Sequence, residues 1–196
     1  MKDLKTTHTA CYDVLTSAVK NAVHPEPHPS GRFKPASVIG LVGLTLDPYL
    51  LFIEKADLAG YPWRNQMAFP GGHTEPGDRD RKATALRELE EEMGISKAHV
   101  EVIGSLGHFQ TINSREIEAF IGIWDQQEKI CPDPGEISRT FPIPVSHLMK
   151  THREKNFQQR SPDIHELTYP YEDVVIWGVT AKIIHHLLEL LHNSAP

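Results

Sequence analysis

The chain has 196 residues and a net charge of −6, and 39% of its residues are hydrophobic. This length suits one globular domain with its own core and is short for two. The acidic balance, without a basic stripe along the sequence, argues against a nucleic-acid partner. No apolar run reaches the roughly 18 residues of a membrane span, and the first residues lack the pattern of a signal peptide. We therefore expect a cytoplasmic protein without a membrane partner, whose two cysteines, Cys11 and Cys131, are reduced thiols.

The first part of the chain contains one predicted helix and two predicted strands. Apolar residues at helical spacing predict a helix over residues 4–23, and the Pro-rich segment 24–35 predicts a connector without regular structure. Residues 36–56 predict two strands separated by an Asp-Pro turn. Residues 58–78 form a long loop rich in glycine and proline, and a loop of this kind is usually functional.

The rest of the chain mixes helices with strands. A helical pattern runs from Arg79 to Met93 and stops at Gly94. The further predicted elements are strands over 100–109 and 117–124, a short helix over 145–150, a loop and hairpin over 153–177, and an amphipathic helix over 177–191. His185 and His186 are expected at the polar edge of this last helix, and no histidine is assigned to catalysis. Such a mixture indicates a layered α/β or α+β domain.

The segment "RELEEEMG" (87–94) places several glutamates in the last turns of one predicted helix. At about 100° per residue, Glu88, Glu91 and Glu92 share one face, and Glu90 points away into solvent. Like charges this close repel one another. One interpretation is a solvated acidic face, which most charge runs are. The other is a set of oxygen ligands for Mg²⁺ or Mn²⁺. A core-facing side is expected from four apolar residues of the same helix: Ala85, Leu86, Leu89 and Met93.

The stretch "GGHTEPGDRDRKATALRELEEEMGI" (71–95) resembles the signature of the Nudix hydrolases. Its second half matches that signature from Arg87 to Ile95, whereas Asp78 stands where glutamate is usual and one extra residue precedes Arg87. These departures resemble the coenzyme A diphosphatase branch of the family. Three further stretches are similar to that branch or to the family: "NQMAFPGG" (65–72), "GEISRTFPIPVSHLM" (135–149) and "YPYEDVVIWGVTAKI" (169–183). The resemblance covers roughly residues 36–191.

The resemblance implies a fold and a division of the chain. The fold is a Nudix-type α/β/α sandwich with a mixed β-sheet, to which N-terminal and C-terminal helices are added. The chain then divides into an N-terminal helix with its Pro-rich connector (1–35) and a Nudix hydrolase domain (36–196).

The resemblance also implies the metal site. Glu88, Glu91 and Glu92 become ligands of one to three Mg²⁺ or Mn²⁺ ions, joined by the carbonyl of Gly71. Arg87 would orient Glu91. Glu136 is the candidate for a further ligand or a general base; Glu116 and Glu118 are its rivals, and a plain surface role remains open for each of the three.

The substrate is implied less completely. Members of the coenzyme A branch carry a threonine and an arginine where "LLFIEKA" (50–56) has Phe52 and Lys55. The candidate substrate-binding residues are therefore Lys55, Trp63 and Arg64, with Trp63 and Tyr61 available to stack on an adenine. A third aromatic residue, Phe69, is expected in the core.

The expected activity is the divalent-metal-dependent hydrolysis of a diphosphate linkage in a nucleotide derivative, first of all coenzyme A or its thioesters. Two alternatives stay open: a Nudix hydrolase for ADP-ribose or NADH, and a non-catalytic Nudix binding or regulatory module. The second alternative usually loses a signature carboxylate, and none is missing here. We therefore expect a pyrophosphohydrolase with a small-molecule nucleotide partner; a homodimer is left open.

Overall fold

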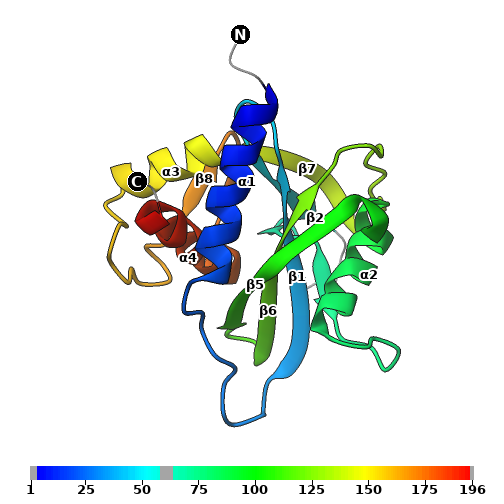
Figure 1. Ribbon diagram of the computed structural model, residues 1–196. Helices are drawn as coiled ribbons and strands as arrows, with labels where there is room; N and C mark the ends of the chain where they lie inside the picture. The colour runs from blue at the N-terminus through cyan, green and yellow to red at the C-terminus, as the bar shows by residue number, and fades with distance from the viewer. Residues whose placement is uncertain (1–3, 58–63, 195–196) are drawn as a thin grey trace.

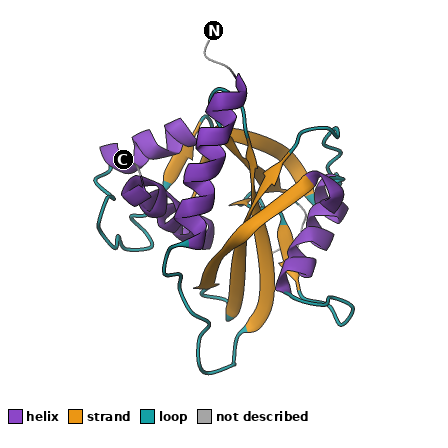
Figure 2. Cartoon of the chain, in the orientation of Figure 1, coloured by secondary structure: helices purple, strands orange, loops and turns teal. Residues whose placement is uncertain are grey.

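A computed structural model describes residues 4–57 and 64–194, with side chains from residue 9 onward. A central β-sheet separates helix α2 on one side from helices α1, α3 and α4 on the other (Figures 1 and 2). The predicted α/β/α sandwich is thus confirmed. Among the described residues, no helix is long and apolar enough to cross a membrane.

The central sheet is mixed. Its strands lie in the order β3-β2-β1-β6-β5, with β4 paired to β1 and β7 paired to β2. Strands β1 and β6 run parallel, and the other pairs are antiparallel. The strands are β1 (Lys34–Gly43), β2 (Tyr49–Lys55), β3 (Met67–Ala68), β4 (Gly71–His73), β5 (Val100–Gln110), β6 (Arg115–Trp124) and β7 (Ile137–Pro144).

The helices and a small hairpin complete the described part of the chain. The helices are α1 (Leu4–Lys20), α2 (Arg81–Met93), the short η1 (Lys97–His99), α3 (Val145–Glu154) and α4 (Gly178–Ser194). The hairpin consists of β8 (Tyr169–Tyr171) and β9 (Val174–Ile176), within the region where the sequence predicts one.

The sheet is buried on both faces because helices cover both. Side chains alternate along a strand, so Ile39 and Leu41 of β1 pack under α2 while Val42 packs toward α1 and α4. Helix α2 contributes its predicted apolar side to the first of these cores: Ala85, Leu89 and Met93 are fully buried and Leu86 packs against them. This packing fixes the rotation of α2 about its axis and therefore the direction of its acidic face.

The N-terminal helix packs on the same body as the rest of the chain. Leu15 and Val19 of α1 belong to the core cluster that also contains Leu187 and Leu188 of α4. The predicted connector (24–35) ends earlier than expected, because β1 already begins at Lys34. Proline is tolerated in the first positions of a strand, and Pro35 is the second residue of β1. A domain boundary at residue 35 stays a prediction.

Two parts of the sheet were not predicted. Strand β7, "ISRTFPIP", contains two prolines, which argue against a strand in the middle of a sheet. It is an edge strand that pairs with β2, where a missing N–H can face outward. Strands β3 and β4 are two and three residues long and lie inside the predicted loop 58–78. Elements this short are fixed by pairing with β2 and β1 rather than by local pattern.

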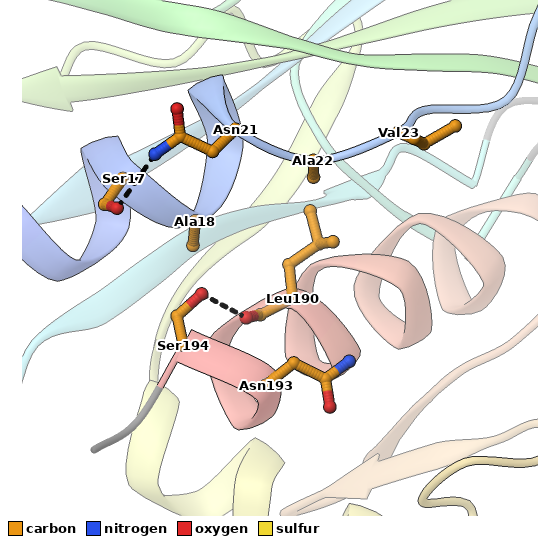
Figure 3. A pocket seen from close by; sticks show the side chains of 8 residues that line it. All are labelled: Ser17, Ala18, Asn21, Ala22, Val23, Leu190, Asn193 and Ser194. Atoms are coloured by element: carbon orange, nitrogen blue, oxygen red, sulfur yellow. Dashed lines mark hydrogen bonds between the residues drawn. The ribbon is translucent and has the colours of Figure 1, made fainter.

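A shallow hollow of about 320 Å³ lies between the end of α1 and the end of α4 (Figure 3). Its lining consists of Ser17, Ala18, Asn21, Ala22, Val23, Leu190, Asn193 and Ser194. None of these side chains is titratable or charged, so the hollow offers no group for acid–base or metal chemistry.

A histidine pair couples α4 to the segment after α1. His24 donates from Nε2 to the carbonyl of Val19 (2.7 Å), and its Nδ1 shares a hydrogen bond with Nε2 of His186 (3.0 Å). Burial, together with the nearby His24 and His185, lowers the pKa of His186 from 6.5 to about 4. The unfolded chain therefore binds a proton at this histidine at a higher pH than the folded chain does.

The folded state should consequently lose stability as the pH falls from about 6.5 to about 4. We expect the substitution His186→Gln to flatten the dependence of Tm on pH in this window, measured by circular dichroism. The variant His192→Gln, on the same helix, should keep the wild-type dependence. An unchanged slope in His186→Gln would contradict this assignment.

Candidate functional site

Local signals at both ends of α2 position the acidic helix. The side chain of Asp80 accepts a hydrogen bond from the backbone N–H of Ala83 (2.7 Å), so the helix begins at residue 81 rather than 79. At the other end, the N–H of Gly94 donates to the carbonyl of Glu90. With the apolar side of α2 on the sheet, its glutamates lie beside strand β4.

Glu92 is the most deeply placed carboxylate of the acidic helix, with a relative exposure of 2%. One of its oxygens pairs with the ammonium of Lys55, and the other accepts from the backbone N–H of Gly71 (3.0 Å). Burial raises the pKa of Glu92 to about 6, and Lys55 opposes this effect. A buried carboxylate beside a cation and a backbone donor is thus held in one place.

Glu88 and Glu91 lie on the same side of the helix as Glu92, and both are more exposed than Glu92. Glu88 is half-buried, and burial raises the pKa of its carboxyl, with the charge of Glu91 adding to the rise. Glu91 is largely exposed. Both accept from the same guanidinium nitrogen of Arg87, at 3.1 and 2.8 Å. Glu90 is exposed, as expected.

Arg87 is anchored by a residue that the sequence did not identify as its partner. Asp78 accepts two parallel hydrogen bonds from Arg87, both 3.0 Å long. It also accepts from the hydroxyl of Thr84 and the N–H of Glu75, each at 2.9 Å. These bonds hold the pKa of Asp78 well below its usual range. The signal was present in the sequence, because Asp78 occupies the signature position where glutamate is usual.

The loop before α2 approaches the acidic helix closely because it carries two glycines. A Cβ atom on Gly72 would overlap the carboxylate of Glu88. Gly71 has a φ of 150°, and a Cβ there would overlap the carbonyl of Ser37 on β1. Glycine alone lets the backbone come this near to a carboxylate and to a neighbouring strand. The carbonyl of Gly71 as a metal ligand stays a prediction, since the contact in the structure is through its N–H.

The three glutamates considered as a further ligand or base lie in different surroundings. Glu136 is half-exposed, and its carboxylate lies 3.8 Å from the ammonium of Lys55. Glu116 is buried and already accepts from the N–H of His28, with Arg81 nearby at 3.6 Å. Glu118 lies on β6 opposite Ser37 of β1, and Ser37 in turn lies opposite Gly72 of β4. The structure thus brings Glu136 toward the acidic helix through Lys55.

The expected substrate-binding residues are placed differently from one another. Lys55 is buried (7% exposed) and its ammonium bonds to Glu92, so the structure places it within the acidic site. Arg64 is exposed and lies 3.9 Å from Asp57. Trp63 and Tyr61 lie outside the described residues. The expectation that Phe69 belongs to the core is confirmed, because it is 2% exposed and packs in the central core.

The residues present fit a hard divalent cation. Three carboxylates on one helix face offer only oxygen ligands, the set that Mg²⁺ and Mn²⁺ prefer. Two of them have raised pKa values because burial and the neighbouring carboxylate disfavour their negative charge. A divalent cation at this place would relieve both effects.

The mixed sheet between helices carries a glycine loop that leads into a glutamate-rich helix, and the carboxylates gathered there can hold divalent cations. The family model described as the NUDIX domain matches residues 34–174, and the chain belongs to this family. It is therefore a Nudix hydrolase, an enzyme of the pyrophosphohydrolase type.

Relatives of known sequence support this membership. The chain is 32% identical over 126 residues to the Nudix hydrolase NudL of Photorhabdus laumondii, covering 63% of this chain and 67% of the relative. It is 31% identical over 145 residues to NudL of Yersinia pestis, covering 73% and 72%. The fold is similar to that of a MutT/nudix family protein from Enterococcus faecalis, with a TM-score of 0.53 at 15% identity over 90% of this chain and 72% of that one.

Proposed function

We propose that this Nudix hydrolase cleaves the diphosphate linkage of coenzyme A or its thioesters with the help of Mg²⁺ or Mn²⁺. The observation that carries the metal-dependent part is the complete set of Glu88, Glu91 and Glu92, held against the glycine loop and tied to Lys55 and Arg87. The choice of coenzyme A rests on the stretches around "NQMAFPGG" and "YPYEDVVIWG" that are similar to the coenzyme A branch.

The residues of the chain divide the work among themselves. Bound divalent ions supply charge neutralisation of the diphosphate and a water of lowered pKa. Glu88, Glu91 and Glu92 hold those ions. Arg87 fixes the orientation of Glu88 and Glu91 through its own anchorage on Asp78.

Two further residues complete the proposed site. Lys55, with the N–H of Gly71, keeps Glu92 in position and adds one positive charge beside the acidic cluster. Glu136 accepts the proton of the attacking water or adds a ligand, because it reaches Lys55 from the loop before β7. Glu118 is the remaining rival for this role.

A panel of substrates tests the proposed activity. Coenzyme A, ADP-ribose, NADH and nucleoside triphosphates would each be incubated with the protein and Mg²⁺ or Mn²⁺, and the products separated by chromatography. We expect coenzyme A to give 3′,5′-ADP and 4′-phosphopantetheine at the highest kcat/KM. A preference for ADP-ribose or NADH would show that the enzyme acts on another nucleoside diphosphate derivative and not on coenzyme A. No turnover of any compound would favour a binding module.

Arg64 provides a test of how the 3′-phosphate of coenzyme A is recognised. Its neighbour Asn65 donates from the backbone to the carbonyl of Lys55 (3.0 Å), so the backbone next to Arg64 lies beside the end of β2. The guanidinium of Arg64 is exposed and lies 3.9 Å from Asp57. Losing a charge-assisted contact with phosphate costs about 1.5–3 kcal/mol, or roughly ten- to a hundredfold. Arg64→Ala should lower kcat/KM for coenzyme A by about that factor and leave 3′-dephospho-coenzyme A nearly unaffected.

Arg79→Ala is the matched control, because Arg79 is also exposed but pairs with Asp80 at the start of α2. This variant should cleave both compounds like the wild type. Equal loss on both compounds in Arg64→Ala would show that Arg64 does not recognise the 3′-phosphate.

A further inference from the structure

A second group of metal-ligating side chains lies on the face of the sheet opposite α2. His152 stands in the last turn of α3, and His185 and Glu189 stand one turn apart on α4. These two helices lie side by side (Figure 1). One potential ligand atom from each of the three side chains lies within 4.8 Å of the others. His152 is fully buried, so the group is built into the fold rather than scattered over the surface.

Each of the three side chains has its other polar atom fixed by a separate partner. Nε2 of His185 donates to the carbonyl of Arg160 (2.9 Å), since a carbonyl can only accept. Nδ1 of His152 bonds to the hydroxyl of Tyr169 (2.9 Å), and Oε2 of Glu189 accepts from the N–H of Gln159 (2.9 Å). Metal ligands are oriented in this way by hydrogen bonds to their far atoms.

The atoms that remain point to a cation. With Nε2 protonated, Nδ1 of His185 carries a lone pair, yet it is buried and has no hydrogen-bond partner among the described residues. A buried polar atom without a partner is costly and calls for an explanation. The other two potential ligand atoms, Nε2 of His152 and Oε1 of Glu189, bond to each other at 2.8 Å. That bond satisfies two of the three atoms and leaves the third unexplained.

We propose that His152, His185 and Glu189 form a zinc site, separate from the acidic helix. Two imidazoles and one carboxylate, with a fourth position left for water, are a ligand set that zinc accepts. Imidazole suits zinc, whereas Mg²⁺ and Mn²⁺ prefer oxygen ligands. Ligand atoms around a tetrahedral zinc lie about 3.3–3.5 Å apart, given bonds of roughly 2.0–2.1 Å. Nε2 of His152 and Oε1 of Glu189, 2.8 Å apart, would therefore separate slightly, and the side chain of His185 would supply the third ligand from within the 4.8 Å that encloses the group.

Zinc binding requires the ring proton of His152 to be on Nδ1 instead of Nε2, and the hydroxyl of Tyr169 can accept a hydrogen bond from it there. In the metal-free state its Nε2 donates to Glu189 and its Nδ1 accepts from Tyr169. A tyrosine hydroxyl can donate or accept. On metal binding, the proton of the neutral ring is carried on Nδ1 and donated to Tyr169, and Nε2 turns its lone pair to zinc. The bound ion then joins α3 to α4 and stabilises the face of the sheet that they cover.

Titration of the metal-stripped protein with Co²⁺, a spectroscopic substitute for zinc, tests the proposal. We expect one equivalent to bind with the visible absorption of a low-coordinate nitrogen–oxygen site, and Zn²⁺ to displace it. Glu189→Gln and His185→Gln should each weaken Co²⁺ binding by at least about a hundredfold, because even outer partners of a metal are worth 10–100-fold. His192→Gln, on the same helix but outside the group, should bind Co²⁺ like the wild type.

The Glu189→Gln variant is expected to stay folded, because the glutamine amide can still accept from Gln159 and donate to His152. A loss of metal binding in this variant therefore reports on the ligand and not on unfolding. Its Tm without metal should stay close to that of the wild type, while Zn²⁺ should raise the Tm of the wild type only. The proposal is overturned if Glu189→Gln binds Co²⁺ as tightly as the wild type. It is also overturned if Co²⁺ binding is lost in Glu91→Gln alone, since the ion would then sit on the acidic helix.

Discussion

Replacing Glu91 by glutamine is expected to lower kcat by at least about a hundredfold while the protein stays folded. The change removes one proposed oxygen ligand and one negative charge from the acidic helix, and a lost metal ligand is worth several kcal/mol of transition-state stabilisation. Glu91 is largely exposed and bonds to Arg87, which keeps its other partners, so the fold depends little on it. Turnover would be measured at saturating substrate with Mg²⁺ and with Mn²⁺, and Tm by circular dichroism without metal.

Two further variants interpret the result. Glu90→Gln changes the neighbouring residue, which points into solvent, and should be almost silent. Glu88→Gln should lose activity like Glu91→Gln but melt no lower than the wild type without metal, because burial already opposes its charge. Near-normal activity in both Glu88→Gln and Glu91→Gln would contradict the proposal that these carboxylates bind the catalytic metal.

Glu92→Gln is a less clean probe of the same site. Glu92 pairs with Lys55 in a buried setting, and removing one partner of such a pair is usually strongly destabilising. A loss of activity in this variant would therefore combine a lost ligand with a disturbed fold.

Arg87→Lys is expected to reduce both activity and stability. Lysine keeps the charge but loses the planar fork that makes two parallel bonds to Asp78 and reaches Glu88, Glu91 and the carbonyl of His73. We expect kcat/KM to fall roughly tenfold or more, and the free energy of unfolding to fall by about 1–3 kcal/mol, the cost of unsatisfied charge-assisted bonds. Steady-state kinetics and urea denaturation measure the two effects.

Arg79→Lys is the control for Arg87→Lys. Arg79 is exposed and pairs with Asp80 at the start of the helix, so the substitution should leave activity unchanged. Arg81 is unsuitable as a second control, because its guanidinium bonds to the carbonyls of Ala36 and Glu116. Equal losses in Arg79→Lys and Arg87→Lys would indicate general electrostatics rather than a positioned guanidinium.

Much of the site could be predicted because its signals are local. Helical periodicity separates the apolar side of α2 from Glu88, Glu91 and Glu92, and the helix ends where Gly94 predicts. The pairing of Arg87 with Glu91, four residues apart, follows from helix geometry and is present in the structure.

The remaining features depend on contacts between distant segments. Lys55 comes from β2 to Glu92 on α2, and Asp78 turns back from the loop to Arg87. Neither contact leaves a periodic pattern in the sequence. The two prolines of β7 argue against a strand, but β7 pairs with β2 at the edge of the sheet, where prolines are tolerated. That edge position cannot be inferred from the local sequence. His185 was expected at a polar edge, but α3 and the loop after it cover it in the fold.

Equilibrium binding of Mn²⁺, followed by electron paramagnetic resonance of the free ion, tests the central claim most directly. Mn²⁺ prefers oxygen ligands, so it reports on the carboxylates of the acidic helix rather than on histidines. The wild type and Glu90→Gln should bind Mn²⁺ with equal affinity, and Glu91→Gln should bind at least about tenfold more weakly. Equal Mn²⁺ affinity in all three proteins would contradict the assignment of Glu88, Glu91 and Glu92 as the metal-binding face of this Nudix hydrolase.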